Sequence, residues 1–149
     1  MRPVGLGLLI AAFFLALPLS SDGKTGPRAE KRSPLTGTYV TKRHKSAGGT
    51  LLVRQLSPSK IEFDLECNRG APSYNSGTAR ATVDVTNGVA VYRTTEFNGP
   101  CEIKFEFKGT SVVVSQTGAE FACGFGHGVD CGGIYRLKSR KPPKFEERQ

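Results

Sequence analysis

Cysteine and histidine, which bind metals readily and can act as nucleophile and base, gather in one short segment of the chain. The segment FACGFGHGVDCGG (residues 121–133) holds Cys123, His127 and Cys131 at intervals of four, with Asp130 beside the last cysteine. Thiolate and imidazole groups are zinc ligands, and a histidine beside an aspartate can serve a hydrolase as its base. In an oxidising compartment the cysteines would form disulfides instead.

The glycine content of this segment argues against the metal and the catalytic interpretations. Ligands four residues apart converge on one face of a helix, but five glycines between residues 121 and 133 make a helix unfavourable. A fourth zinc ligand does not follow nearby, and the chain has no GxSxG motif that would mark a serine nucleophile. We therefore expect no enzyme activity, no metal and no other cofactor. A small secreted hydrolase or zinc-binding protein centred on His127 is the less favoured alternative.

Alternation of apolar and polar residues dominates the rest of the chain. In KIEFDLEC (residues 60–67) and CEIKFEFK (residues 101–108), apolar side chains alternate with charged ones, which predicts half-buried strands. Turn residues separate the alternating stretches, and the Asn87-Gly88 pair is the clearest hairpin signal. Weaker stretches of the same kind occupy residues 36–42, 49–56, 77–85, 88–96, 110–117 and 132–138.

Eight short strands joined mostly by tight turns predict an antiparallel meander. With no helix to cover it, such a sheet must close or fold over in order to bury its apolar face and its edges. We predict an all-β fold: a single small antiparallel up-and-down (meander) barrel, or a flattened barrel, of about eight strands, stapled by disulfides.

The N-terminal residues have the layout of a secretory signal peptide. An apolar run from Val4 to Leu19 follows the basic Arg2. The run is about 16 residues long, short of the ~20 that span a bilayer as a helix, so we expect export and no transmembrane span. The mature protein would be secreted or periplasmic. The predicted organisation is a signal peptide at 1–21, a disordered basic linker at 22–34, the β-barrel domain at 35–138 and a disordered basic tail at 139–149.

An even number of cysteines in a small exported domain predicts disulfides. All four cysteines, Cys67, Cys101, Cys123 and Cys131, lie in the predicted mature domain. We favour pairing Cys123 with Cys131, because the glycine-rich segment between them can fold back on itself. Cys67 would then pair with Cys101, which begins a strand where Cys67 ends one. The crossed pairings stay open.

The chain is basic, with a formal net charge of +8 at pH 7. This charge favours anionic partners such as envelope glycans or lipopolysaccharide. The segment TKRHK (residues 41–45) places four basic side chains where a predicted strand runs into a glycine-rich turn. Aromatic residues are not interleaved with the basic ones, so we expect no specific nucleic-acid binding.

The order of these segments resembles a family of small bacterial exported β-barrel domains, some of which accompany the LprI-type lysozyme-inhibitor proteins. The resemblance covers about residues 35–138 and is most specific at Cys101 with the strand after it, and at CGFG (residues 123–126) followed by GIY (residues 133–135). It implies a binding or inhibitor protein of the bacterial envelope without a cofactor. Cys131 departs from that pattern, and a basic protein is poorly matched to animal lysozymes, which are themselves basic.

We therefore predict a non-enzymatic binding protein whose partner is a protein or an anionic envelope or glycan ligand. Its recognition surface would be the loops at residues 42–49, 68–77 and 121–132, because loops are the variable surface of a meander barrel. The alternative function is a polyanion-binding module that uses the basic cluster. The candidate contact residues are Lys42, Arg43, His44, Lys45, Tyr74, Phe125 and His127. For Tyr74 we favour packing over the barrel mouth, and for His127 an idle role is an equal alternative.

Overall fold

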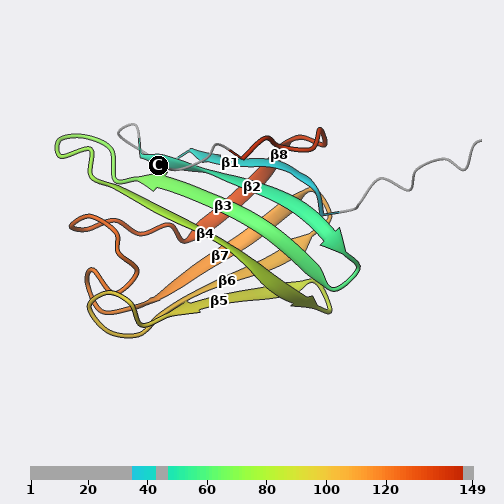
Figure 1. Cartoon of the computed structure of the whole chain (residues 1–149). Coiled ribbons are helices and arrows are strands. Elements are labelled where there is room, and N and C mark those ends of the chain that lie inside the picture. The colour runs from blue at the N-terminus through green and yellow to red at the C-terminus, as the bar shows by residue number, and fades with distance from the viewer. Residues whose placement is uncertain (1–34, 43–46, 146–149) are drawn as a thin grey trace, which may run out of the picture. The chain divides into compact units, whose positions relative to one another are not determined.

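The computed structural model describes residues 35–42 and 47–145. In these ranges the chain forms eight strands, each antiparallel to the next, and the last returns to the first to close a barrel (Figure 1). The predicted eight-stranded up-and-down barrel is therefore confirmed. The strands are β1 (Gly37–Lys42), β2 (Gly48–Ser57), β3 (Lys60–Asn68), β4 (Ser76–Thr86), β5 (Val89–Thr94), β6 (Cys101–Lys108), β7 (Ser111–Gly118) and β8 (Gly133–Ser139).

Some of the sequence-based expectations fall outside the described residues. These are the signal peptide and basic linker at residues 1–34, and Arg43, His44 and Lys45 of the basic cluster. Within the described ranges, no helix has the length and hydropathy needed to cross a membrane.

The alternating strands place their apolar side chains inside the barrel. Phe63 of β3 lies at the centre of an aromatic group, with ring centroids 4.7 Å from Phe105 and 5.7 Å from Tyr92. The two buried tyrosines also satisfy their hydroxyls: Tyr39 donates to the Leu35 carbonyl and Tyr135 to the Cys131 carbonyl, each at 2.9 Å. The interior is thus packed with side chains.

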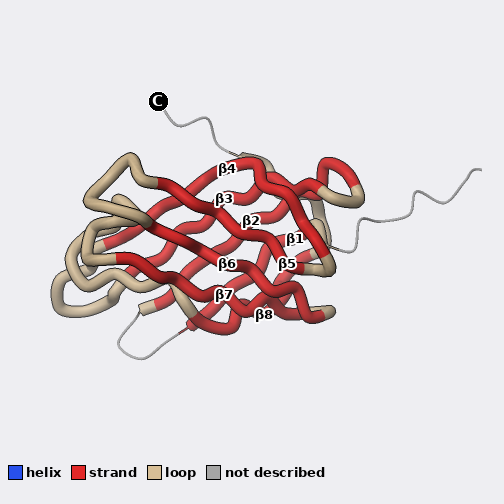
Figure 2. Tube along the Cα trace, turned by 90° about the horizontal axis from the view of Figure 1, so that it is seen from below, coloured by secondary structure: helices blue, strands red, loops and turns tan. Residues whose placement is uncertain are grey.

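The connections at the two ends of the barrel differ in length, as Figure 2 shows. At one end, which we call the turn end, short turns join β2 to β3, β4 to β5 and β6 to β7. At the other, the loop end, longer connections join β3 to β4 (residues 69–75), β5 to β6 (95–100) and β7 to β8 (119–132), and the paired strand ends Lys42 of β1 and Gly48 of β2 lie there too. Alternate connections of a meander share an end, so the loops at residues 68–77 and 121–132 lie at the same end, while most of the predicted loop at 42–49 lies outside the described residues.

The barrel has one weak seam, between β4 and β5. These strands pair only at Val85 with Ala90 and at Thr86 with Val89, beside their turn. They diverge toward the loop end, where the β7–β8 loop lies between them (Figure 1). The Gly126 amide donates to the Ser76 carbonyl of β4 at 3.0 Å. The loop thus occupies the wide part of the seam.

The disulfide pairing differs from the predicted one. The structure joins Cys67 to Cys131 and Cys101 to Cys123, with Cα separations of 5.5 Å and 5.1 Å. Cys67 and Cys101 cannot meet, because β4 and β5 lie between their strands, and three strand spacings amount to about 14 Å along the sheet. Cys101 lies opposite Gly118 in the β6–β7 ladder, so the turn after β7 brings Cys123 back beside it.

The two disulfides lie on opposite sides of the β4–β5 seam. Cys131 ties the end of the β7–β8 loop to β3, the neighbour of β4, while Cys123 ties its start to β6, the neighbour of β5. The loop between the two cysteines is therefore a covalent bridge across the gap where the backbone ladder stops.

The predicted tail contacts the barrel up to the end of the described residues. The Arg140 guanidinium donates to the Tyr39 hydroxyl at 3.2 Å and to the Gly109 carbonyl at 3.0 Å. Phe145 lies under two guanidinium groups, 4.7 Å from that of Arg54 and 4.8 Å from that of Arg80. Arg140 and Phe145 of the predicted tail thus have partners in the barrel that composition alone does not reveal, while residues 146–149 lie outside the described residues.

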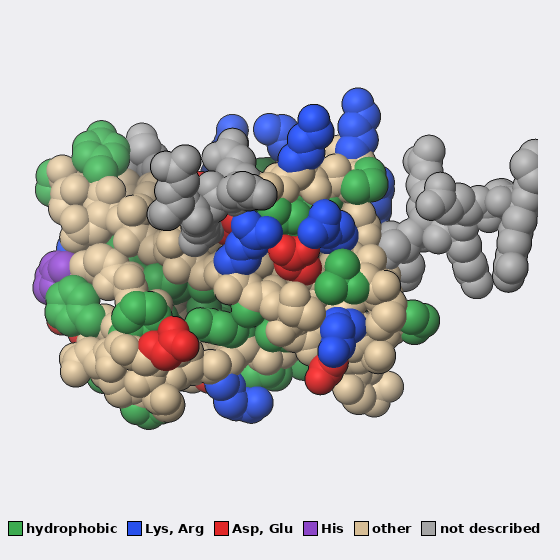
Figure 3. Space-filling view, viewed as in Figure 1, with side chains coloured by type: hydrophobic (Ala, Val, Ile, Leu, Met, Phe, Trp, Pro, Cys, Tyr) green, Lys and Arg blue, Asp and Glu red, His purple; other side chains and the backbone are tan. Residues whose placement is uncertain are grey.

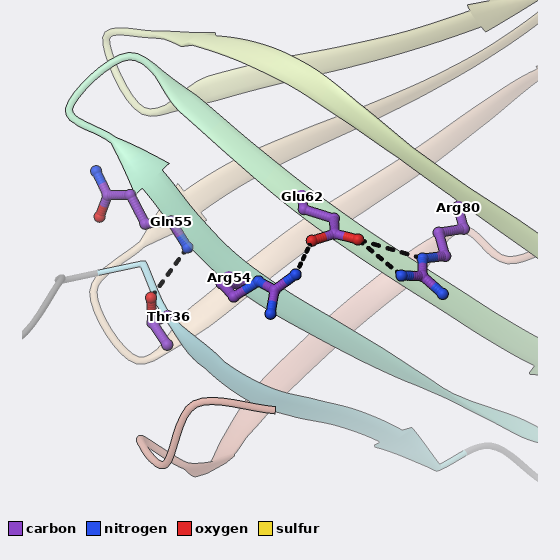
Figure 4. A network of polar contacts seen from close by, with 5 residues as sticks. All are labelled: Thr36, Arg54, Gln55, Glu62 and Arg80. Carbon is purple, nitrogen blue, oxygen red and sulfur yellow. Dashed lines mark hydrogen bonds and ion pairs between the residues drawn. The ribbon is translucent and has the colours of Figure 1, made fainter. Parts of the chain in front are cut away.

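The two arginines that stack on Phe145 belong to an ion-pair network that ties β2, β3 and β4 together on their outer face. Glu62 accepts from Arg54 on one side and from Arg80 on the other, the latter at 2.8 Å (Figure 4). The hydrogen bond from Arg80 holds the pKa of Glu62 below its usual value, and Arg54 adds to this effect. Glu62 is therefore ionised in the folded protein at neutral pH.

Candidate binding surface at the loop end

Three large apolar side chains are exposed at the loop end. Tyr74, Phe97 and Phe121 have exposed fractions of 63%, 52% and 45%. They come from three different loops, β3–β4, β5–β6 and β7–β8. Figure 3 shows hydrophobic side chains and a histidine at this end, whereas lysines and arginines gather toward the other. Exposed apolar side chains from separate loops at one end are typical of an interaction surface.

Backbone strain marks two of these aromatic residues. Tyr74 has a φ of 52° and Phe121 a φ of 66°, in the left-handed region that bulky side chains rarely adopt. Asn87 has the same conformation in the β4–β5 hairpin, where asparagine is favoured. For Tyr74 and Phe121 no such local preference exists, and strained residues concentrate at functional sites. The strain therefore favours a functional role for Tyr74 and Phe121.

Contacts between the loops hold the surface together. The Asn75 side-chain amide donates to the His127 carbonyl at 2.8 Å, which joins the β3–β4 loop to the β7–β8 loop. The Asn98 side-chain amide donates to the Glu120 carbonyl at 3.2 Å, which joins the β5–β6 loop to the same segment. The Phe97 ring lies directly over Gly124, where a Cβ atom would be 2.7 Å from it. The aromatic side chains are thus presented on loops that brace each other.

His127 is exposed and paired with a carboxylate. Its Nδ1 lies 2.6 Å from Glu120 Oε1, and the same oxygen accepts from the Gly128 amide at 3.2 Å. The imidazole ring is 6.2 Å from the Phe121 ring, centroid to centroid. Together Glu120, Phe121 and His127 offer a partner an apolar ring, a hydrogen-bonding ring and a negative charge within one short segment.

The sequence-predicted contact residues have different fates in the structure. Tyr74 and His127 are exposed at the loop end, and Lys42 is exposed at the end of β1. Phe125 is not a contact residue: it is 4% exposed, and its ring covers Gly77 of β4. The seam beside β4 leaves a space that an aromatic side chain of the loop fills, which the local sequence does not show.

The disulfides also change what His127 can do. Cys123 and Cys131 are both in disulfides, so neither is available as a thiolate to bind zinc with His127 or to act as a nucleophile. Asp130 was the possible carboxylate partner of His127, but its side-chain oxygen accepts a hydrogen bond from the Gly132 amide at 2.7 Å. The carboxylate that contacts His127 is that of Glu120.

The sequence analysis did not name three residues of this surface as contacts: Phe97, Glu120 and Phe121, the last of which it included only within the loop 121–132. Phe97 stands in FNGP (residues 97–100), a predicted turn between two strands, and a large apolar residue in such a turn was the available signal. Glu120 lies seven residues before His127, and its contact with the histidine depends on the fold of the loop, for which the sequence carries no marker.

Comparisons of the chain with protein-family models, with curated proteins and with solved structures give no match. The resemblance to the domains that accompany LprI-type proteins therefore stays a prediction.

Proposed function

We propose that this protein is an exported, non-enzymatic binding protein that contacts a partner protein through its loop end. The observation that carries the proposal is the presentation of Tyr74, Phe97 and Phe121 on three loops that two disulfides brace. Aromatic side chains held at low conformational freedom are the usual anchors of protein interfaces, because little entropy is lost when they bind.

The disulfides support an oxidising compartment, which agrees with the proposed signal peptide. The exposed imidazole–carboxylate pair supports a contact role, since a base held at the surface in water lacks the desolvated pocket that tunes catalytic groups. The finer proposal is a lysozyme-inhibitor-like or envelope-associated role, in the secreted or periplasmic space, as the family resemblance implies.

A turbidity assay of bacterial cell lysis tests the inhibitor version. Lysozymes of different classes are mixed with the purified full chain, and inhibition at a stoichiometric ratio is the expected result. Alanine variants of Tyr74, Phe97 and Phe121 should each weaken inhibition at least tenfold, because hot-spot aromatic residues contribute 2 kcal/mol or more, about thirtyfold in affinity.

Leu56→Ala is the matched control. Leu56 is 50% exposed, similar to Phe97, but it lies beside the β2–β3 turn at the opposite end. This variant should inhibit like the wild type. Equal losses in Leu56→Ala and in the loop-end variants would show that the loop end is not the contact surface, and an absence of inhibition for every lysozyme class would remove the inhibitor version. If this protein lysed the cells without added lysozyme, and if His127→Ala abolished that lysis, the enzyme alternative would be restored.

Polyanion binding is the second candidate, and one groove favours it. Lys42 of β1 and Lys138 of β8 line a groove of about 680 Å³, in which Glu66 of β3 is the one acidic residue among the described lining residues. Retention on heparin that falls steeply with salt would support this function, and the double variant Lys42→Ala/Lys138→Ala should elute at lower salt. Lys104→Ala is the control, because Lys104 is paired with Glu106 on β6. Equal elution of all three proteins would contradict a role for the groove.

A further inference from the structure

The seam between β4 and β5 leaves a cleft in the wall of the barrel. Ladder pairing ends at Val85 with Ala90, although β4 remains fully paired to β3 and β5 to β6. The cleft has a volume of about 640 Å³. It lies between the turn of the β4–β5 hairpin and the β7–β8 loop, which contacts β4 at Ser76. The lining residues come from both strands, namely residues 81–84, 86, 89 and 91–93.

The direction of the backbone groups on β4 follows from two hydrogen bonds. In an antiparallel ladder, the N–H and C=O of one residue point to the same neighbour and those of the next residue to the other side. The Val85 amide donates to the Ser59 carbonyl at 2.8 Å. The backbone N–H and C=O groups of Val85, Val83 and Ala81 therefore point toward β3. The Ser76 carbonyl, which accepts from the Gly126 amide, points away from β3, to the side of β4 that faces the cleft. Thr82, in phase with Ser76, therefore turns its N–H and C=O into the cleft.

The same reasoning applies to β5. The Gly88 carbonyl accepts from the Phe107 amide at 2.8 Å. Every second residue from Gly88, such as Ala90 and Tyr92, therefore directs its backbone N–H and C=O toward β6. Arg93, out of phase with Gly88, therefore presents its backbone N–H and C=O to the cleft. In the described part of the chain, no strand is paired to Thr82 or Arg93 on this side. Two strand edges thus face each other across the cleft without a strand between them.

The side chains of the cleft repeat the pattern of a sheet with a missing strand. Ala81, Val83 and Tyr92 point inward and pack against the core, but each stays partly exposed. Asp84 and Arg93 stand on opposite rims, each with an ion-pair partner on the neighbouring strand, Lys60 at 3.6 Å and Glu102 at 2.7 Å, and their side chains remain 80% and 69% exposed. A chain in the cleft would place alternate side chains on this apolar floor and the others in solvent between rims of opposite charge.

We propose that the cleft binds an extended segment of a partner protein by strand addition along β4. The segment would have small apolar side chains at alternate positions, which pack on Ala81, Val83 and Tyr92. Its outward side chains would be basic near Asp84 and acidic near Arg93. Main-chain hydrogen bonds to Thr82 would supply the affinity and the alternate side chains the specificity.

The geometry favours a single inserted segment over a second copy of this chain. The open edge is recessed between two strands and bounded by the β7–β8 loop and the hairpin turn, so a lone chain can enter. The β4 strand of a second copy would bring its attached β3 with it. The protein's own chain already uses this edge once, in the bond from Gly126 to Ser76. This surface is separate from the loop-end aromatics and does not rest on the proposed function.

Amide hydrogen exchange of the full chain, measured residue by residue by NMR, is the first test of the open edge. The Thr82 and Arg93 amides should exchange at least tenfold faster than the Val83 amide, which the β3 ladder protects. The probe is then a synthetic octapeptide of alternating valine and threonine, with lysine at one end and glutamate at the other. It should slow exchange at Thr82 and Arg93 at least tenfold. The same peptide N-methylated at every position lacks the donors and should have no effect.

Two proline variants separate binding from folding. Thr82→Pro removes an N–H that faces the cleft, so the barrel should keep its stability while peptide binding falls at least tenfold. Val83→Pro removes an N–H of the β3 ladder and should destabilise the barrel instead. The proposal is overturned if Thr82 exchanges as slowly as Val83 in the free protein, or if the peptide has no effect at millimolar concentration. It is also overturned if protection rises with protein concentration alone, which would indicate a second copy.

Discussion

The two ends of the barrel are closed by different means. At the turn end, two-residue connections such as Asn87-Gly88 reverse the chain, and the contacts of Arg140 and Glu62 lie in this half. At the loop end, long connections carry both disulfides and expose three aromatic residues. Local backbone chemistry suffices where connections are short. Long loops need covalent constraint, and that constraint allows apolar side chains to stay in solvent at defined positions.

The largest effect should come from the disulfide that ties the β7–β8 loop to β3. Cys67 and Cys131 are 64 residues apart, so the chain-entropy model gives their bond about 4 kcal/mol of unfolding free energy, against about 3 kcal/mol for Cys101 and Cys123, 22 residues apart. Urea denaturation of the paired alanine variants should give losses in that order. Peptide mapping without reductant is the control: a link between Cys67 and Cys101 would contradict the bridged seam.

The packing of the loop into the seam should give the next largest effect. A Cβ atom at Gly77 would overlap the Phe125 ring, so Gly77→Ala should lower the unfolding free energy by about 1–3 kcal/mol. Phe125→Leu makes room for that methyl group. The double variant should therefore lose less than the sum of the single losses, as measured by a double-mutant cycle in urea. Strictly additive losses would show that the two residues do not touch.

A comparable change at the turn end should cost less. Gly88 has a φ of 76°, but its nearest neighbour to an added Cβ is the Phe107 carbonyl at 3.6 Å, an ordinary contact. Gly88→Ala should thus lose only the backbone preference, about 1 kcal/mol in thermal or urea unfolding. Gly88→Asn, which tolerates the left-handed region, should lose less than Gly88→Ala. A loss at Gly88→Ala above that of Gly77→Ala would reverse the contrast between the two ends.

The smallest effect should be electrostatic and depend on pH. Because Arg80 and Arg54 lower the pKa of Glu62 in the folded state, ionised Glu62 stabilises the fold above its unfolded pKa, and this contribution is lost as the pH falls through the folded pKa. Glu62→Gln should cost about 1 kcal/mol or less at pH 7. The difference from wild type should shrink as the solution is acidified below about pH 4, and a constant difference in urea titrations across that range would contradict the ion pairing.

The alternating stretches made most of the fold predictable. KIEFDLEC and CEIKFEFK became β3 and β6, and Asn87-Gly88 became the β4–β5 turn, because alternation and turn chemistry act within a few residues. The loop end was predicted less well. Tyr74 and His127 were candidate contact residues and are exposed, but the candidate Phe125 is buried and Phe97 was not named, since their exposure depends on which loop fills the space beside β4.

By itself, the sequence determined the strands, their inward and outward faces, and an even set of cysteines suited to disulfides. Only the tertiary structure decided which cysteines meet, where the ladder stops, and which side chains the β7–β8 loop covers or exposes. The physical reason is range. Alternation and turn preferences are local, whereas disulfide partners and the β4–β5 seam depend on distances set by closure of β8 onto β1 and by the strands that lie between.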